Sequence, residues 1–352
     1  MSALRLIQAG LGNRGTMWAE IIAAHPAARH VAVVDPDPAR IARFQARWPD
    51  VPGFATLDQA LAGTPADAVL LATPPDGHLD QCRACFQARL PVLAEKPLSL
   101  DPAEANDIVR LSQAHGVRLT VGLNFRYLAV TQAKRALVAA ERFGPPGFAQ
   151  MTYQRNRDGR LPRLNKYPLT MRHPMMLEQT VHHLDLLRFV YAREVESVSC
   201  RSWNPGWSMY AHDSNIACHL TMQGGLEVSY LGTWTGGWDR LEFLWRTDAP
   251  EGVILQRQLF DDLAVAGRLV PDPVAVPLDA CEPFRDDTRA LLDAFIAALR
   301  DDTAMPCDGQ DHLRTLAVCF AAIESAETGR VVKVADWAAR HMPAAGLTEA
   351  MA

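Results

Sequence analysis

The feature that most constrains this chain is a glycine-containing turn close to its N-terminus. The turn, Gly10-Leu11-Gly12-Asn13-Arg14-Gly15, follows an apolar segment, Leu4–Ala9, and precedes a helix-like segment, Thr16–Ala24. In such a strand–turn–helix unit, the first glycine permits a tight turn, the second lets a phosphate approach the backbone, and the third allows the helix to pack closely on the strand. Free N–H groups at the helix N-terminus attract the anion. We therefore predict a Rossmann-type domain whose turn binds a dinucleotide.

Beyond the turn, the first 125 residues alternate short apolar segments with amphipathic ones. Helices are predicted at Pro38–Trp48 and after Asp101, where an acidic cap precedes Pro102. This alternation is typical of βαβ units, in which helices cover both faces of a parallel sheet. The predicted strands are Leu4–Ala9, Val31–Val34, Ala68–Ala72, Pro91–Ala94 and Leu119–Gly122.

The pattern changes after Asn124. Val228–Leu231 and Leu241–Trp245 predict antiparallel strands with one packed face and one wetter face. The predicted helices of this part are Met176–Tyr191, Phe284–Arg300 and His312–Glu327. We therefore predict a Rossmann domain at 1–125, an α+β domain with a large, mainly antiparallel open sheet at 126–335, and a C-terminal tail at 336–352, of which Met342–Ala352 are expected to fray.

The composition of the chain limits which binding partners are expected. The 352 residues carry a formal net charge of −5, which gives no general attraction to nucleic acid or anionic membranes. No apolar run approaches the ~18 residues that span a bilayer, and the N-terminus lacks a signal-peptide pattern. Cys82 and Cys85 lie on a helix-like segment, where small buried side chains are expected rather than a zinc or redox pair. We expect a cytoplasmic protein without a nucleic-acid or membrane partner.

Asp35 ends the second predicted strand, about 20 residues after the glycine turn. A carboxylate at this position accepts hydrogen bonds from the adenosine ribose hydroxyls and repels a 2′-phosphate, which favours NAD over NADP. Arg40 is close enough in sequence to weaken that repulsion, so NADP stays possible.

Three further motifs occur in order, Ala72-Thr73-Pro74-Pro75, Glu95-Lys96-Pro97 and His182-His183-Leu184-Asp185. With the glycine turn and Asp35, they make the sequence resemble the Gfo/Idh/MocA oxidoreductases, which include glucose–fructose oxidoreductase and inositol dehydrogenase. The resemblance extends from Leu4 to about Val334. The Glu-Lys-Pro tripeptide followed by a distant His-x-x-Asp is its specific part.

The resemblance implies a set of residues around the nicotinamide. Lys96 would contact both the nicotinamide and a substrate hydroxyl, and its charge would favour an alkoxide-like oxygen. The turn Thr73-Pro74-Pro75 and His78 would pack along the nicotinamide ribose. Glu95 and Asn124 would also adjoin the cofactor.

His182 corresponds to the family histidine proposed to accept the proton of the substrate hydroxyl. Imidazole suits this task because its pKa of about 6.5 lies near the working pH. His183 must point elsewhere on a helix, so only one of the two is the base. Glu178 precedes His182 by four residues and stands where the family usually has Asp, and Thr180 replaces a glycine. The resemblance thus gives Glu178 a catalytic and substrate-binding role, while this departure leaves the substrate open.

Three more residues are candidates for substrate contact. Asp185 either orients the imidazole or a substrate hydroxyl, or is a helix-surface acid or a cap. Arg126 either contacts substrate or ties the two domains together. Arg155 belongs to a basic loop that either recognises an anionic sugar such as a uronate or forms a solvated or subunit-contacting surface. The other cations of this basic loop are Arg157, Arg160, Arg163, Lys166 and Arg172.

These residues favour a dehydrogenase or reductase that moves hydride between NAD(P) and a sugar, cyclitol or related polyol. The alternative is a ligand-sensing regulator that binds nucleotide without catalysis, but such a protein needs neither Lys96 nor His182. The carboxylates and histidines around His182 also have metal-ligand chemistry, although hydride transfer explains more residues, so we expect no metal. We also expect a homodimer or homotetramer.

Overall fold

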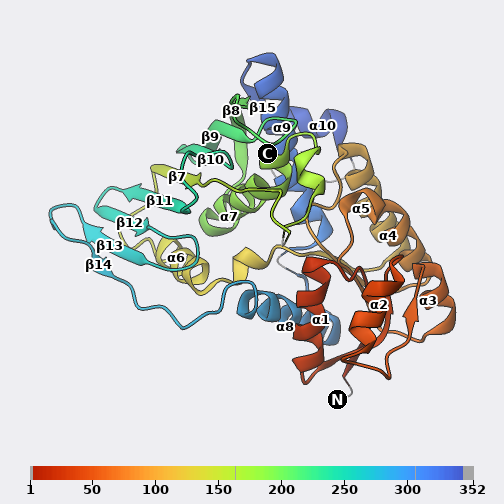
Figure 1. Ribbon diagram of the computed structural model, residues 1–352. Helices are drawn as coiled ribbons and strands as arrows, with labels where there is room; N and C mark the ends of the chain where they lie inside the picture. Colours follow the sequence, from red (N-terminus) through yellow and green to blue (C-terminus); the bar gives the residue numbers. More distant parts are fainter. Residues whose placement is uncertain (1–2, 163, 306, 344–352) are drawn as a thin grey trace. The chain divides into compact units, whose positions relative to one another are not determined.

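The computed structural model describes residues 3–162, 164–305 and 307–343 (Figure 1). The chain forms two compact units, and each is described by itself below. The first consists of Met1–Asn124 and Thr288–Leu313, and the second of Phe125–Asp287 and Arg314–Ala352.

The first unit contains a segment that the sequence-based division places elsewhere. We expected all of 126–335 in one domain, whereas 288–313 belong to the first unit. Hydrogen bonds show why, since the N–H of Val121 donates to the carbonyl of Cys307 at 2.9 Å. Sequence periodicity reflects neighbours along the chain and does not reveal the return of a distant segment to the first unit.

The first unit is built on a six-stranded parallel sheet in the order β3-β2-β1-β4-β5-β6. Its strands are β1 (Leu4–Ala9), β2 (Ala28–Val34), β3 (Gly53–Phe54), β4 (Ala68–Leu71), β5 (Val92–Ala94) and β6 (Leu119–Val121). Its helices include α1 (Asn13–Ala24), α2 (Pro38–Gln45), α3 (Leu57–Gly63), α4 (His78–Gln87) and α5 (Pro102–His115). The predicted parallel sheet with helices is confirmed, and β3 is the strand that prediction missed.

Local signals set the ends of these helices. Asp101 accepts hydrogen bonds from the N–H groups of Ala103 and Glu104, and α5 then ends at Gly116, which has a left-handed backbone with φ of 60°. These are the acidic cap and the glycine stop that favour a helix at this place. Cys82 and Cys85 are buried in α4, as expected.

The second unit contains a nine-stranded sheet in the order β14-β13-β12-β11-β7-β10-β9-β8-β15. The pairs are antiparallel except that β10 runs parallel to β7, so the predicted mainly antiparallel sheet is confirmed. Its strands are β7 (Phe148–Gln154), β8 (Val195–Trp203), β9 (Asn215–Met222), β10 (Leu226–Thr233), β11 (Glu242–Ala249), β12 (Gly252–Gln256), β13 (Leu263–Gly267), β14 (Val274–Ala275) and β15 (Val332–Lys333).

The helices differ from prediction in several places. The segment expected as one helix is a π-helix, η4 (Met175–Thr180), followed by α7 (Val181–Tyr191). The predicted tail, 336–352, begins inside α10 (Val334–His341), a helix that was not predicted, and the ring of Trp337 stacks on Phe320 with centroids 5.7 Å apart. The rest of the predicted tail, 344–352, lies outside the described residues. The remaining helices are α6 (Ala129–Ala139), α8 (Asp286–Asp301) and α9 (Gly309–Thr328).

No helix in the described part of the chain is both long and apolar enough to cross a membrane.

Lys134 is a fully buried lysine on α6. Its Nζ donates to the carbonyl of Trp245 at 3.0 Å and lies 4.5 Å from the centroid of the same indole ring. Burial lowers the pKa of Lys134 well below its usual value. The folded protein therefore holds this amine in its neutral form over a range of pH in which the unfolded chain binds a proton.

We predict that Lys134→Met stabilises the protein at pH 7 by about 1 kcal/mol or more. Because the pKa of Lys134 is lowered on folding, the wild type gains stability as pH rises, up to the unfolded pKa of about 10.4. The advantage of the variant should therefore shrink toward that pH. Urea denaturation at pH 7 and pH 10 measures the free energy of unfolding of the wild type and of Lys134→Met, with the exposed Lys333→Met as control. A variant less stable than wild type at pH 7 contradicts the prediction.

Candidate active site

The glycine turn has the backbone geometry that its sequence predicts. Gly10 has φ of 93°, and a Cβ on it would overlap the carbonyl of Ala72. A Cβ on Gly15 would overlap the carbonyl of Gly10, whereas one on Gly12 would meet nothing within 4 Å. The first and third glycines therefore permit close packing, and the second leaves open space beside the backbone.

The open space lies at the N-terminus of α1. Gly12 is the N-cap residue and has no side chain with which to cap the first-turn N–H groups. Uncapped N–H groups at the positive end of a helix dipole bind an anion well. The turn therefore fits the pyrophosphate of a dinucleotide.

Asp35 lies buried at the end of β2, beside the turn. Its Oδ2 accepts from the N–H of Leu11 at 2.8 Å, and its Oδ1 accepts from the N–H of Asp37 at 2.9 Å. The guanidinium of Arg40 lies 3.4 Å from Oδ2. The carboxylate is thus held in place, as its predicted contact with ribose hydroxyls requires, while the nearby Arg40 keeps a 2′-phosphate possible.

Glu95 connects the predicted lysine motif to α1. Its Oε1 accepts from Nε of Arg14 at 2.6 Å and from the indole N–H of Trp18 at 2.7 Å. Burial raises the pKa of Glu95, but the charge and hydrogen bonds of these two partners outweigh it, and the net pKa is lowered. Glu95, the residue before Lys96, is therefore an ionised link to α1.

His78 holds together two loops at the carboxyl edge of the sheet. Its Nδ1 lies 3.0 Å from the carbonyl of Leu98, and its Nε2 lies 3.2 Å from the carbonyl of Thr73. The side chain is fully buried, and burial lowers its pKa. These contacts give His78 a supporting position between the Thr73-Pro74-Pro75 turn and the loop that follows Lys96.

Lys96 and Asn124 follow neighbouring strands, β5 and β6. The carboxyl ends of parallel strands meet at one edge of the sheet, which is where open α/β sheets bind ligands. The first unit thus gathers at one edge the glycine turn, Asp35, the Thr73-Pro74-Pro75 turn, Lys96 and Asn124.

In the second unit, His182 and His183 of α7 point to different neighbours, as helical spacing predicts. The imidazole of His182 stacks on the ring of Phe125, with centroids 4.4 Å apart and an interplanar angle of 22°. Nδ1 of His183 lies 2.8 Å from the hydroxyl of Tyr230, and burial lowers the pKa of His183 to about 3. His183 therefore anchors the helix as a neutral side chain, which leaves His182 as the candidate base.

Glu178 lies on the π-helix η4, so its spacing to His182 is not that of a regular α-helix. Its Oε2 accepts from the hydroxyl of Tyr167 at 2.7 Å. π-helical turns are rare and often occur at functional sites. Tyr167 is a neighbour that sequence reasoning missed, because a single tyrosine in a basic loop carries no motif.

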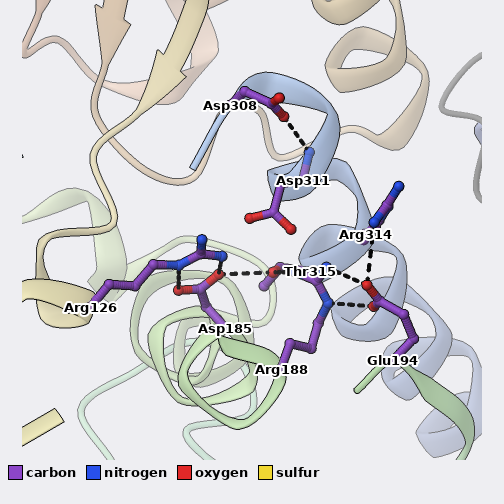
Figure 2. A network of polar contacts seen from close by, with 8 residues as sticks. All are labelled: Arg126, Asp185, Arg188, Glu194, Asp308, Asp311, Arg314 and Thr315. Atoms are coloured by element: carbon purple, nitrogen blue, oxygen red, sulfur yellow. Dashed lines mark hydrogen bonds and ion pairs between the residues drawn. The ribbon is translucent and has the colours of Figure 1, made fainter. Parts of the chain in front are cut away.

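Arg126 and Asp185 form an ion pair in which both side chains are buried (Figure 2). Nε of Arg126 donates to Oδ2 of Asp185 at 2.7 Å, and a second guanidinium nitrogen bonds Oδ1. Thr315 also donates to Oδ1, at 3.1 Å. Arg126 and Asp185, both predicted as candidates for substrate contact, thus supply each other's hydrogen-bond partners.

The network continues from Thr315 along α7 and α9 (Figure 2). Arg188 donates to the hydroxyl of Thr315 at 2.7 Å and to Oε2 of Glu194 at 2.6 Å. Arg314 lies 3.5 Å from Oε1 of the same Glu194. Buried charges arranged in this way fix the rotation of α7, the helix that carries His182.

Arg155 directly follows β7. Its Nε is buried and has no hydrogen-bond partner among the described residues. Nearby, Arg157 donates to the hydroxyl of Tyr210 at 3.3 Å and lies 4.3 Å from the centroid of Trp234. The exposed Arg160 pairs with Asp158. Arg163 of the basic loop lies outside the described residues.

Comparison with protein families agrees with these features. Residues 4–123 match the model of an oxidoreductase family with an NAD-binding Rossmann fold, and residues 131–245 match the GFO/IDH/MocA C-terminal domain. The chain belongs to the Gfo/Idh/MocA oxidoreductase family, and its cofactor is a nicotinamide dinucleotide.

Individual relatives cover most of the chain. It is 30% identical over 349 residues to inositol 2-dehydrogenase of Mycolicibacterium smegmatis, and the match covers 95% of this chain and 97% of that protein. It is 24% identical over 283 residues to 1,5-anhydro-D-fructose reductase of Ensifer adhaerens, at 78% and 82% coverage. An oxidoreductase from Agrobacterium radiobacter, solved in complex with NAD+, L-tartaric acid and magnesium, shares the fold with a TM-score of 0.87 at 20% identity, and the match covers 95% of this chain and 99% of that one.

We predict that Arg126→Met costs about 3–5 kcal/mol of unfolding free energy, because it leaves the Asp185 carboxylate buried without its cation. The double variant Arg126→Met/Asp185→Leu should recover most of that loss. Urea denaturation of the wild type, both single variants and the double variant measures the coupling. A small loss of stability together with a raised substrate KM would contradict this structural role. It would indicate instead that Arg126 and Asp185 bind the substrate.

Proposed function

We propose that the protein catalyses NAD(P)-dependent oxidation of a CH–OH group, or reduction of the corresponding carbonyl, in a sugar, cyclitol or related polyol. One observation carries this proposal. The chain belongs to this family and has both Lys96, at the sheet edge that carries the dinucleotide motifs, and His182, on a buried helix. The nicotinamide, when bound, accepts or returns the hydride. The names of the inositol and anhydrofructose relatives support the substrate class.

Lys96 and His182 divide the work on the substrate hydroxyl. The ammonium group of Lys96 would stabilise negative charge on the oxygen as the C–H bond weakens. His182 would hold the departing proton, which suits an imidazole of near-neutral pKa. Phe125, stacked on the ring, limits the directions in which that imidazole can turn.

Glu178 and Arg155 would set which substrate binds. Glu178 carries an acceptor one methylene farther from the backbone than Asp, and the Tyr167 hydroxyl fixes one of its oxygens. The unsatisfied Nε of Arg155 supports contact with an acidic group on the substrate. Asp185 and Arg126 would act by positioning α7, since each satisfies the other.

The assembly and location complete the proposal. On the face of the second-unit sheet opposite Tyr153, Leu231, Thr152 and Leu244 form a half-buried row across β10, β7 and β11. Such a row suits contact with a second copy of the chain, in a homodimer or homotetramer. The seven free cysteines are compatible with the reducing cytoplasm.

We expect wild-type enzyme with NAD+ to form reduced nicotinamide on at least one member of a panel of inositols, aldoses and uronates. Lys96→Ala should lower kcat/KM by a factor of about 100 or more while the protein still binds NADH, and His182→Ala should lower kcat similarly. Absorbance of reduced nicotinamide gives the rates, and NADH fluorescence gives the binding. Lys333→Met serves as a control lysine substitution.

Full activity of Lys96→Ala would contradict the assigned role. NADH binding without turnover on any substrate would favour the alternative, a ligand-sensing regulator. The same panel tests the substrate's charge, because Arg155→Ala should selectively weaken turnover of uronates. An unchanged ranking of neutral and acidic substrates would remove Arg155 from the site.

A further inference from the structure

Gln8 is a polar residue in the central strand of the first unit. β1 pairs with β2 on one side and β4 on the other, and the Gln8 side chain is fully buried. Strands of parallel sheets are usually continuous apolar runs, since both faces are covered. A buried amide in such a strand is costly unless its polar atoms have partners. None of the roles assigned above uses this side chain.

The Gln8 amide bonds to both ends of the glycine turn. Its Nε2 donates to the carbonyl oxygens of Gly10 at 3.0 Å and Gly15 at 2.7 Å. These two contacts fix the orientation of the amide, because the opposite orientation would set Oε1 against two carbonyl oxygens. Its Oε1 lies 3.0 Å from Nε2 of His30, which must therefore be the donor.

His30 is itself held by aromatic neighbours. The ring meets Phe44 edge-on, with centroids 5.2 Å apart, and its centroid lies 6.4 Å from that of Trp48. Burial lowers the pKa of His30 to about 4, so it is neutral at physiological pH and carries its proton on Nε2. Gln8 thus has one fixed orientation at physiological pH.

The first consequence concerns the peptide between Gly10 and Leu11. A peptide unit is planar, so holding its carbonyl and its N–H fixes its orientation. Gln8 holds the carbonyl of Gly10, and Asp35 accepts from the N–H of Leu11 at 2.8 Å. This peptide is therefore fixed from both sides.

The peptide between Gly15 and Thr16 is held in the same way. Gln8 binds the carbonyl of Gly15, and the N–H of Thr16 donates to the carbonyl of Gly12 at 2.8 Å. The amide thus joins the start of the turn to the first turn of α1. The N–H groups at the N-terminus of α1, which has no side-chain cap, therefore keep one direction.

We propose that Gln8, oriented by His30, is a positioning residue for the pyrophosphate of the dinucleotide. It fixes the turn in its binding shape before the cofactor arrives, which lowers the ordering cost of binding. The proposal rests on the NAD-binding assignment of the first unit and not on the proposed polyol chemistry.

The test compares ligands with and without a pyrophosphate. Calorimetric titration with ADP-ribose and with adenosine would be run on the full-length wild type, Gln8→Met and His30→Phe. Met keeps the length of the side chain and removes its hydrogen bonds. Leu6→Met is the matched control, because Leu6 is buried two residues earlier on the same side of β1.

We expect Gln8→Met to weaken ADP-ribose about tenfold and adenosine less than about threefold, since two buried turn carbonyls each lose one donor. His30→Phe should weaken ADP-ribose about threefold, because it removes only the outer hydrogen bond. Leu6→Met should leave the ratio of the two affinities unchanged. An unchanged ratio in folded Gln8→Met overturns the proposal, as do equal losses for both ligands. If Gln8→Met does not fold, an unchanged ratio in His30→Phe overturns it.

Discussion

The close approach of α1 to β1 at the glycine turn is the contact on which the first unit depends. No side chain larger than hydrogen fits where Gly15 meets the carbonyl of Gly10. That approach brings the N-terminus of α1 to the carboxyl edge of the sheet, and the Arg14–Glu95 ion pair extends it to the residue before Lys96. One steric constraint thus sets the position of both the anion site and the lysine loop.

The second unit depends on buried polar contacts around a single helix. α7 is buried along most of its length, and charged residues occupy positions that an apolar core would normally fill. Asp185 is matched by Arg126, and His183 by Tyr230. These partners specify one rotation of the helix, so His182 presents its ring to Phe125 rather than to the sheet. The role proposed for His182 as a base requires surroundings that are fixed in this way.

The sequence predicted the parts of the fold that local patterns encode. β1 was predicted with its observed bounds, and the glycine turn, Asp35 and the two-sheet architecture follow from spacing and alternation. The return of 288–313 to the first unit and the π-helix before α7 depend on contacts between distant segments, which periodicity does not contain.

The same distinction between local motifs and contacts in three dimensions applies to the site residues. Motifs marked Lys96 and His182, whereas Phe125, which stacks on His182, and Tyr167, which donates to Glu178, carry no motif. Gln8 had a visible signal, a polar residue inside a buried strand, but its partner could be found only in three dimensions.

The most direct test of the account is the fate of the hydrogen on the carbinol carbon. The substrate identified in the panel would be prepared with deuterium at that carbon and incubated with the enzyme and NAD+. Mass spectrometry of the reduced cofactor would then show whether the label moves. Direct hydride transfer predicts one deuterium in each reduced nicotinamide and none in the solvent. Oxidised substrate with the label released to water, or with unlabelled reduced cofactor, would contradict the account.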